Sequence, residues 1–180
     1  MTAQPDHGRV GTSRIRYHPG NVFMSVGLLF RVLIYFLLAV IAAALLGSVI
    51  QSQFNLGAIS ALGAEVPVAL WLTTTLQDLA GFAPLYAGIV AVALLPALIA
   101  AALVSHWCVP ASAQGLQAVV YAVAGAVGLF VAFQLADAFA PMPTLIAATR
   151  TAGGTLAMMA SGALGGWLFA RLVMLGRPAS

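Results

Sequence analysis

The chain has 180 residues, of which 62% are hydrophobic and 6% are charged, and its mean hydropathy is +1.05. Water-soluble domains carry about 25% charged residues, so this chain has too little polar surface to cover a soluble fold. The composition predicts an all-α integral membrane protein, and the length fits one domain. The basic residues are all arginines and form no run with interleaved aromatic residues, so nucleic acid is not an expected partner.

Cysteine and histidine give no basis for a disulfide, a metal site or a haem. Cys108 is the only cysteine, so the chain can form neither an internal disulfide nor a CxxC redox pair. His7 and His18 lie in the polar N-terminal segment and His106 lies in an expected turn. Haem in a helical bundle needs ligands inside the spans. We therefore expect no metal and no cofactor.

Four apolar stretches have the length of transmembrane helices. A span needs about 20 apolar residues, and the expected spans cover about residues 32–50, 85–104, 116–139 and 151–174. Together they form a single membrane domain, residues 22–176, which follows a polar N-terminal segment, residues 1–21. The sequence thus predicts a four-helix transmembrane bundle.

The first apolar stretch, residues 22–50, is longer than the hydrocarbon core of a bilayer, which is about 30 Å thick. We expect Arg31 to lie at the membrane boundary, and the residues before it to form an interfacial start to the helix. An arginine inside the bundle with a functional partner is the alternative. A cleaved signal peptide is a further alternative, but the stretch is too long and no small-x-small cleavage site follows it.

Residues 51–84 lie between two expected spans but are too polar to form one. A short helix is expected to end at Gly63. Another is expected to begin at Pro67 and to end at Gly81, before Pro84 opens the second span. We predict that this segment lies along the membrane surface as an interfacial helix, with a re-entrant loop into the bundle as the alternative.

The arginines indicate the orientation of the spans. Most of the seven lie near the N-terminal segment or at the end of the fourth span, whereas residues 51–84 contain none. Because cytoplasmic segments carry the excess of arginine and lysine, both termini are expected in the cytoplasm and residues 51–84 on the extracytoplasmic side. The expected location is the inner membrane of a bacterium, with the lipid bilayer as a partner.

Small residues recur at four-residue spacing on the expected helices and let helix backbones approach closely. The pattern is strongest in the fourth span, where the expected packing residues are Gly153, Ala157, Ser161, Gly162, Gly165 and Gly166. We expect these residues to pack inside the bundle, with contact to a partner as the alternative. The expected assembly is a homo-oligomer or a complex with other membrane subunits.

The polar side chains expected at the extracytoplasmic face form the candidate site, and they are Glu65, Asp78, Gln134, Asp137 and Arg150. Asp137 and Arg150 flank one short turn, so we expect an ion pair that anchors the membrane boundary. The alternative is a polar vestibule in which Glu65 or Asp78 joins Asp137 to receive a cation, a proton or a polar headgroup. No catalytic residue is assigned, because nothing fixes the separation of the carboxylates.

Three functions fit these observations. The favoured one is a non-enzymatic accessory or assembly subunit of a membrane complex, because the spans hold few polar groups and many small residues. The alternative is a small oligomeric transporter or channel for an ion or a small polar or lipid solute, with its mouth at the polar face. The third is a lipid-modifying enzyme at the outer leaflet, which would require two carboxylates held close together.

Overall fold

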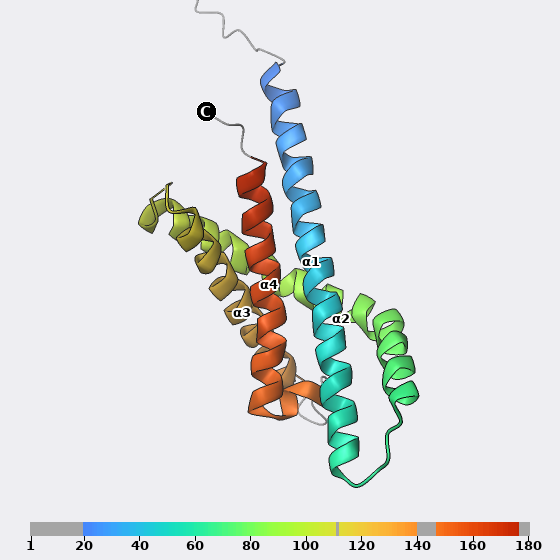
Figure 1. The fold of residues 1–180 in the computed structure, drawn as a ribbon. Helices are drawn as coiled ribbons and strands as arrows, with labels where there is room; N and C mark the ends of the chain where they lie inside the picture. The colour runs from blue at the N-terminus through green and yellow to red at the C-terminus, as the bar shows by residue number, and fades with distance from the viewer. Residues whose placement is uncertain (1–19, 111, 140–146, 177–180) are drawn as a thin grey trace, which may run out of the picture.

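The computed structural model describes residues 20–110, 112–139 and 147–176, so nearly all of the polar N-terminal segment lies outside the described residues. This described part consists of helices and has no strand (Figure 1): α1 (Gly20–Ala61), α2 (Val68–Cys108), α3 (Gln114–Phe139), the short 3-10 helix η1 (Ala147–Arg150) and α4 (Ala152–Leu175). Four of these helices are long and apolar enough to cross a membrane. The prediction of an all-α structure with four helices apolar enough to cross a membrane is confirmed for the described residues.

The four α-helices form a ring in which neighbours in the chain are also neighbours in space. α1 packs against α2 and α4, and α3 packs against the same two helices, so α1 and α3 lie at opposite corners. Figure 1 shows α1 and α4 side by side and antiparallel, with α3 inclined to both. η1 contacts α1 and α4 and closes one end of this pair.

Two hydrogen bonds fix α1 to the two ends of α4. Arg31 Nη1 donates to the carbonyl of Gly176 at 2.9 Å, just beyond the last turn of α4. The N–H of Ala148 in η1 donates to Gln51 Oε1 at 2.9 Å, just before α4 begins. The last carbonyls of a helix have no partner within it, and a guanidinium there also complements the helix dipole. We call these two ends of the bundle the Arg31 end and the hairpin end.

Residues 51–84 form a helical hairpin, called the hairpin below. Its first arm is the end of α1, which continues past Ile50 to Ala61. The prediction that this arm is a short helix separate from the first span is therefore wrong. The expected helix end at Gly63 is confirmed, because Gly63 follows the last turn of α1 with φ of +87°, a conformation that residues with a Cβ rarely adopt.

The second arm of the hairpin is the start of α2. The helix begins at Val68 directly after Pro67, as predicted, and runs without interruption through Gly81, Pro84 and Pro96. The expected helix end at Gly81 is wrong. A proline inside a helix removes one backbone hydrogen bond and bends the helix, and Figure 1 shows α2 changing direction along its length. The helix continues because α1 and then α3 pack along it.

Glycines bring the backbones of α3 and α4 into direct contact. A Cβ on Gly162 would collide with the carbonyl oxygen of Gly125, and a Cβ on Gly166 would collide with that of Tyr121. On the other side of the bundle, Gly47 of α1 leaves the space that the ring of Tyr86 fills. These contacts pack the helices closely without large side chains between them.

The expected packing residues of α4 differ in their surroundings. Four of them are buried, and they are Ser161, Gly162, Gly165 and Gly166. Ala157 is half-buried. Gly153 is exposed, and no atom would lie within 4 Å of a Cβ added to it. The adjacent Gly154 is the one that packs closely, against the carbonyl of Ala148.

The core contains one polar pair between α2 and α4. Tyr86 is fully buried, and its hydroxyl lies 3.1 Å from Ser161 Oγ. The Tyr86 ring stacks on Phe82 at 5.4 Å and on Phe133 at 6.5 Å between centroids. The hydroxyl is thus satisfied inside an apolar core, as buried polar groups require.

Candidate functional site

The polar side chains of the hairpin bond to each other across its two arms. Ser52 Oγ in α1 donates to Asp78 Oδ2 in α2 at 2.6 Å and also lies 3.0 Å from the Ser48 carbonyl oxygen. Gln53 Nε2 donates to Thr75 Oγ1 at 3.3 Å. A hydrogen bond to a carboxylate is stronger than one between neutral groups, so the Ser52–Asp78 bond is the main polar link between the arms.

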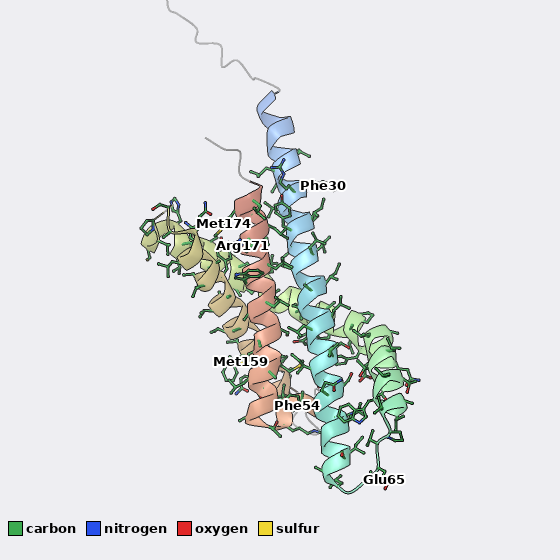
Figure 2. All side chains as sticks on the ribbon, viewed as in Figure 1. Phe30, Phe54, Glu65, Met159, Arg171 and Met174 are labelled. Carbon is green, nitrogen blue, oxygen red and sulfur yellow. The ribbon has the colours of Figure 1, made fainter. Side chains whose placement is uncertain are left out.

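The five residues of the predicted polar cluster come from different elements of the fold. Glu65 is exposed in the turn of the hairpin, at the far tip of the molecule (Figure 2). Gln134 and Asp137 lie in the last turns of α3, and Arg150 ends η1. Asp78 bonds Ser52 of α1. The ion pair and the vestibule remain predictions.

Two buried hydroxyls have no hydrogen-bond partner within the part of the chain that the structure describes. They belong to Ser48 in α1 and Ser105 in α2. The sequence analysis assigned no role to either residue, and its second span ended before Ser105. α2 continues through Ser105 and His106, so the prediction that His106 lies in a turn is wrong. Serine spacing alone gives no signal for an unpaired hydroxyl, because its partner depends on the neighbouring helices.

A cavity of about 330 Å³ lies at the Arg31 end of the bundle, between the last turns of α2, the first turns of α3 and the end of α4. We call it the Ser105 cavity. Its polar lining consists of Ser105, His106, Gln117 and Tyr121, and its apolar lining includes Val109 and Met174. Figure 2 shows Met174 near the C-terminal end of α4, close to Arg171. The sequence analysis did not predict this cavity.

The polar lining of the Ser105 cavity is held by local contacts. Gln117 is buried, and its Nε2 donates to the carbonyl of Pro110 at 3.2 Å, which ties α3 to the turn before it. The Tyr121 ring packs against Phe169 of α4 with 5.9 Å between centroids. These contacts place an amide, a phenol ring and the Ser105 hydroxyl around one space.

A second groove, of about 470 Å³, lies between α2 and α3. Its lining is apolar and includes Pro96 and Gly128. The groove adjoins the place where Gly128 contacts Ala93 and Ala97 of α2. It offers a hydrocarbon surface and no polar group for chemistry.

Within the described ranges, no three side chains of His, Cys, Asp or Glu gather closely enough to hold a metal ion. Polar side chains gather in the bonded arms of the hairpin and in the Ser105 cavity at the opposite end, and the Tyr86–Ser161 pair lies in the core. Comparison with known proteins adds nothing to this assignment: no protein-family model, curated protein or solved structure matches the chain.

Proposed function

We propose that the protein is a non-enzymatic accessory or assembly subunit of a larger complex in a bacterial inner membrane, and that the hairpin is the element that docks on a partner subunit. Both termini lie in the cytoplasm in this proposal. The hairpin then lies at the extracytoplasmic surface, where its arms extend the first two spans into the interfacial region. The arginine distribution supports this orientation.

The observation that carries the proposal is an apolar stripe on the second arm of the hairpin. Val68, Leu72 and Leu76 recur every four residues on α2, and they are 75%, 63% and 65% exposed. Residues at this spacing share one face of a helix. Figure 1 shows this arm beside the end of α1, on the side away from α4. An exposed apolar stripe on the outside of a helical bundle is typical of a contact surface for another helix.

The polar groups of the hairpin support a structural role for it. Ser52, Gln53 and Asp78 use their side chains to join the two arms to each other. Gln51 joins the hairpin to η1. These bonds hold the stripe in a fixed position relative to the bundle, which lowers the entropy cost of docking.

A transporter or channel is the second candidate, and one observation favours it. The unpaired Ser48 hydroxyl is fully buried, one helical turn from Ser52, which bonds Asp78. A polar line from Asp78 into the bundle would be the start of a solute path. Further steps through the bundle would have to use the Tyr86–Ser161 pair, which is buried and already hydrogen-bonded.

Native mass spectrometry of the protein at its natural expression level, extracted from its own membrane in mild detergent, tests the proposal. We expect a second polypeptide at fixed stoichiometry. Replacing the stripe in a Leu72→Ser/Leu76→Ser variant should remove this polypeptide. The matched control is Leu95→Ser/Ile99→Ser, which changes two residues of the same helix at the same spacing, each 55% exposed. The control variant should keep the partner.

Two outcomes would contradict the accessory role. One is a bare monomer in every sample. The other is a homo-oligomer that carries a defined small molecule and is unaffected by the stripe variant, which would favour the transporter. Loss of the partner in both variants would show that apolar exposure in general, and not the hairpin, mediates the contact.

A further inference from the structure

We propose that the Ser105 cavity binds the compact, uncharged head of a membrane-soluble amphiphile whose ring carries carbonyl oxygens, which is the chemistry of a lipid quinone. The site lies at the end of the bundle opposite the hairpin, and it does not depend on the accessory role. The inference rests on the unpaired Ser105 hydroxyl, on the absence of carboxylates and arginines from the described lining, and on the position of the cavity.

Ser105 lines the cavity, and its hydroxyl has no hydrogen-bond partner among the described residues. Helical serine and threonine side chains usually bond to a carbonyl in the preceding turn, and in this protein Thr73 and Thr75 do so. Ser105 is 8% exposed and has no such bond. Leaving a buried hydroxyl unpaired is costly. A ligand oxygen in the cavity would supply the acceptor that the helix does not.

The lining indicates that the ligand has no net charge. Among the described residues that line the cavity there is no carboxylate and no arginine. Phosphate headgroups are recognised by arginine or lysine, and ammonium headgroups by carboxylates or aromatic cages. Ser105 and His106 instead offer hydrogen-bond donors, while the Gln117 amide already donates to Pro110. Such donors fit a carbonyl oxygen.

The size and position of the cavity fit the head of an amphiphile. A volume of about 330 Å³ is at the small end of ligand pockets, which hold roughly 300–1,000 Å³. Trp107, next to His106, is 83% exposed, and tryptophan is enriched at the membrane–water boundary. The apolar lining by Val173 and Met174 fits a flat ring. An apolar tail would continue from the cavity into the hydrocarbon.

The full-length protein in nanodiscs of synthetic phosphatidylcholine, free of quinone, is titrated with decylubiquinone. Nanodiscs that hold the protein are isolated by affinity capture. Their quinone is then extracted and quantified by absorbance. We expect saturation at one quinone per chain above the uptake of empty discs. Ser105→Ala should weaken the apparent affinity about tenfold, the loss of one hydrogen bond. Ala102→Phe, which introduces a ring at a lining position, should abolish saturable binding.

Two matched controls keep the test specific. Ser48→Ala removes the other unpaired buried hydroxyl, which does not line this cavity, and should leave binding unchanged. Leu103→Phe adds a ring next to Ala102 at a position outside the lining, and should also bind as the wild type does. Uptake equal to that of empty discs, or equal affinity in wild type and Ser105→Ala, would overturn the proposal. So would saturable displacement of decylubiquinone by an anionic phospholipid. If Ala102→Phe does not fold, Ser105→Ala alone still decides.

Discussion

At the scale of single residues, glycine determines how closely the helices approach. Gly125, Gly162 and Gly166 place the backbones of α3 and α4 against each other with no side chain between them. Lipid tails are as apolar as leucine, so helices in a membrane gain little from burying leucine and more from close van der Waals contact. The α3–α4 contact is therefore sensitive to one added methyl group.

Gly166→Ala should destabilise the bundle. The new Cβ would meet the carbonyl oxygen of Tyr121 and the Cα of Ala122, which are backbone atoms and can move only with the helix. Overpacking of this kind costs about 1–3 kcal/mol. The measurement is the thermal unfolding midpoint in detergent, followed by the loss of the monodisperse gel-filtration peak.

Gly153→Ala on the same helix is the control for this change. No atom lies within 4 Å of the added Cβ, and alanine is favoured over glycine in a helix by about 1 kcal/mol. The midpoint should stay the same or rise. An equal fall in the two variants would show that the α3–α4 contact is not what Gly166 protects.

At the scale of elements, the apolar lengths predicted four helices correctly, but the polar residues misplaced two helix ends. Gln51 and Asp78 interrupt the apolar stretches of the sequence, but the end of an apolar stretch is not the end of a helix. In the structure these side chains bond between the arms and to η1, so both helices continue. Glycine and proline were also poor indicators of helix ends. Packing against α1 and α3 keeps α2 helical through Gly81 and Pro84.

The candidate sites were less predictable than the helices. Glu65, Asp78 and Asp137 are candidates because carboxylates are rare in an apolar sequence. Whether they lie close together depends on how the helix ends are placed in space. The sequence does not predict the Ser105 cavity, because it does not distinguish a serine with an unpaired hydroxyl from one that bonds its own helix. Only the positions of α3 and α4 show that Ser105 lines a cavity.

Gly57 in the first arm and Gly63 in the turn of the hairpin should respond to replacement by alanine in opposite directions. Gly57 lies inside α1 with no atom within 4 Å of an added Cβ, so Gly57→Ala should stabilise the arm by about 0.5–1 kcal/mol. Gly63 has φ of +87°, so Gly63→Ala should destabilise the turn by about 1–2 kcal/mol. Limited proteolysis of the turn in detergent measures both: cleavage should slow in the first variant and accelerate in the second. Equal cleavage in all three proteins would show that α1 does not end at Gly63 in solution.

At the scale of the whole molecule, four antiparallel helices place the α2–α3 turn and the C-terminal end of α4 at the Arg31 end, and the turn of the hairpin at the other. Arg31 bonds Gly176 at the first of these ends. Arg171 also lies there, and Glu65 lies at the second end (Figure 2). This distribution of charge agrees with the proposed orientation, in which the Arg31 end faces the cytoplasm.

Cys108 allows this orientation to be tested without removing other cysteines. It is the only cysteine of the chain and is exposed at the end of α2. A membrane-impermeant maleimide should label it in inverted inner-membrane vesicles and leave it unlabelled in intact spheroplasts. The Cys108→Ser/Glu65→Cys variant should give the reverse pattern. Labelling of both proteins from the same side would mean that the two turns do not lie on opposite sides of the membrane.

The unbroken length of α1 has a mechanical consequence. Its 42 residues extend about 63 Å at about 1.5 Å per residue, from the first arm of the hairpin to beyond the Arg31–Gly176 bond. A stiff rod held near its middle acts as a lever, since a sideways push at one tip swings the other tip the opposite way. A partner that tilts the hairpin would thereby strain the Arg31–Gly176 bond on the far side of the membrane, without any solute or charge crossing it.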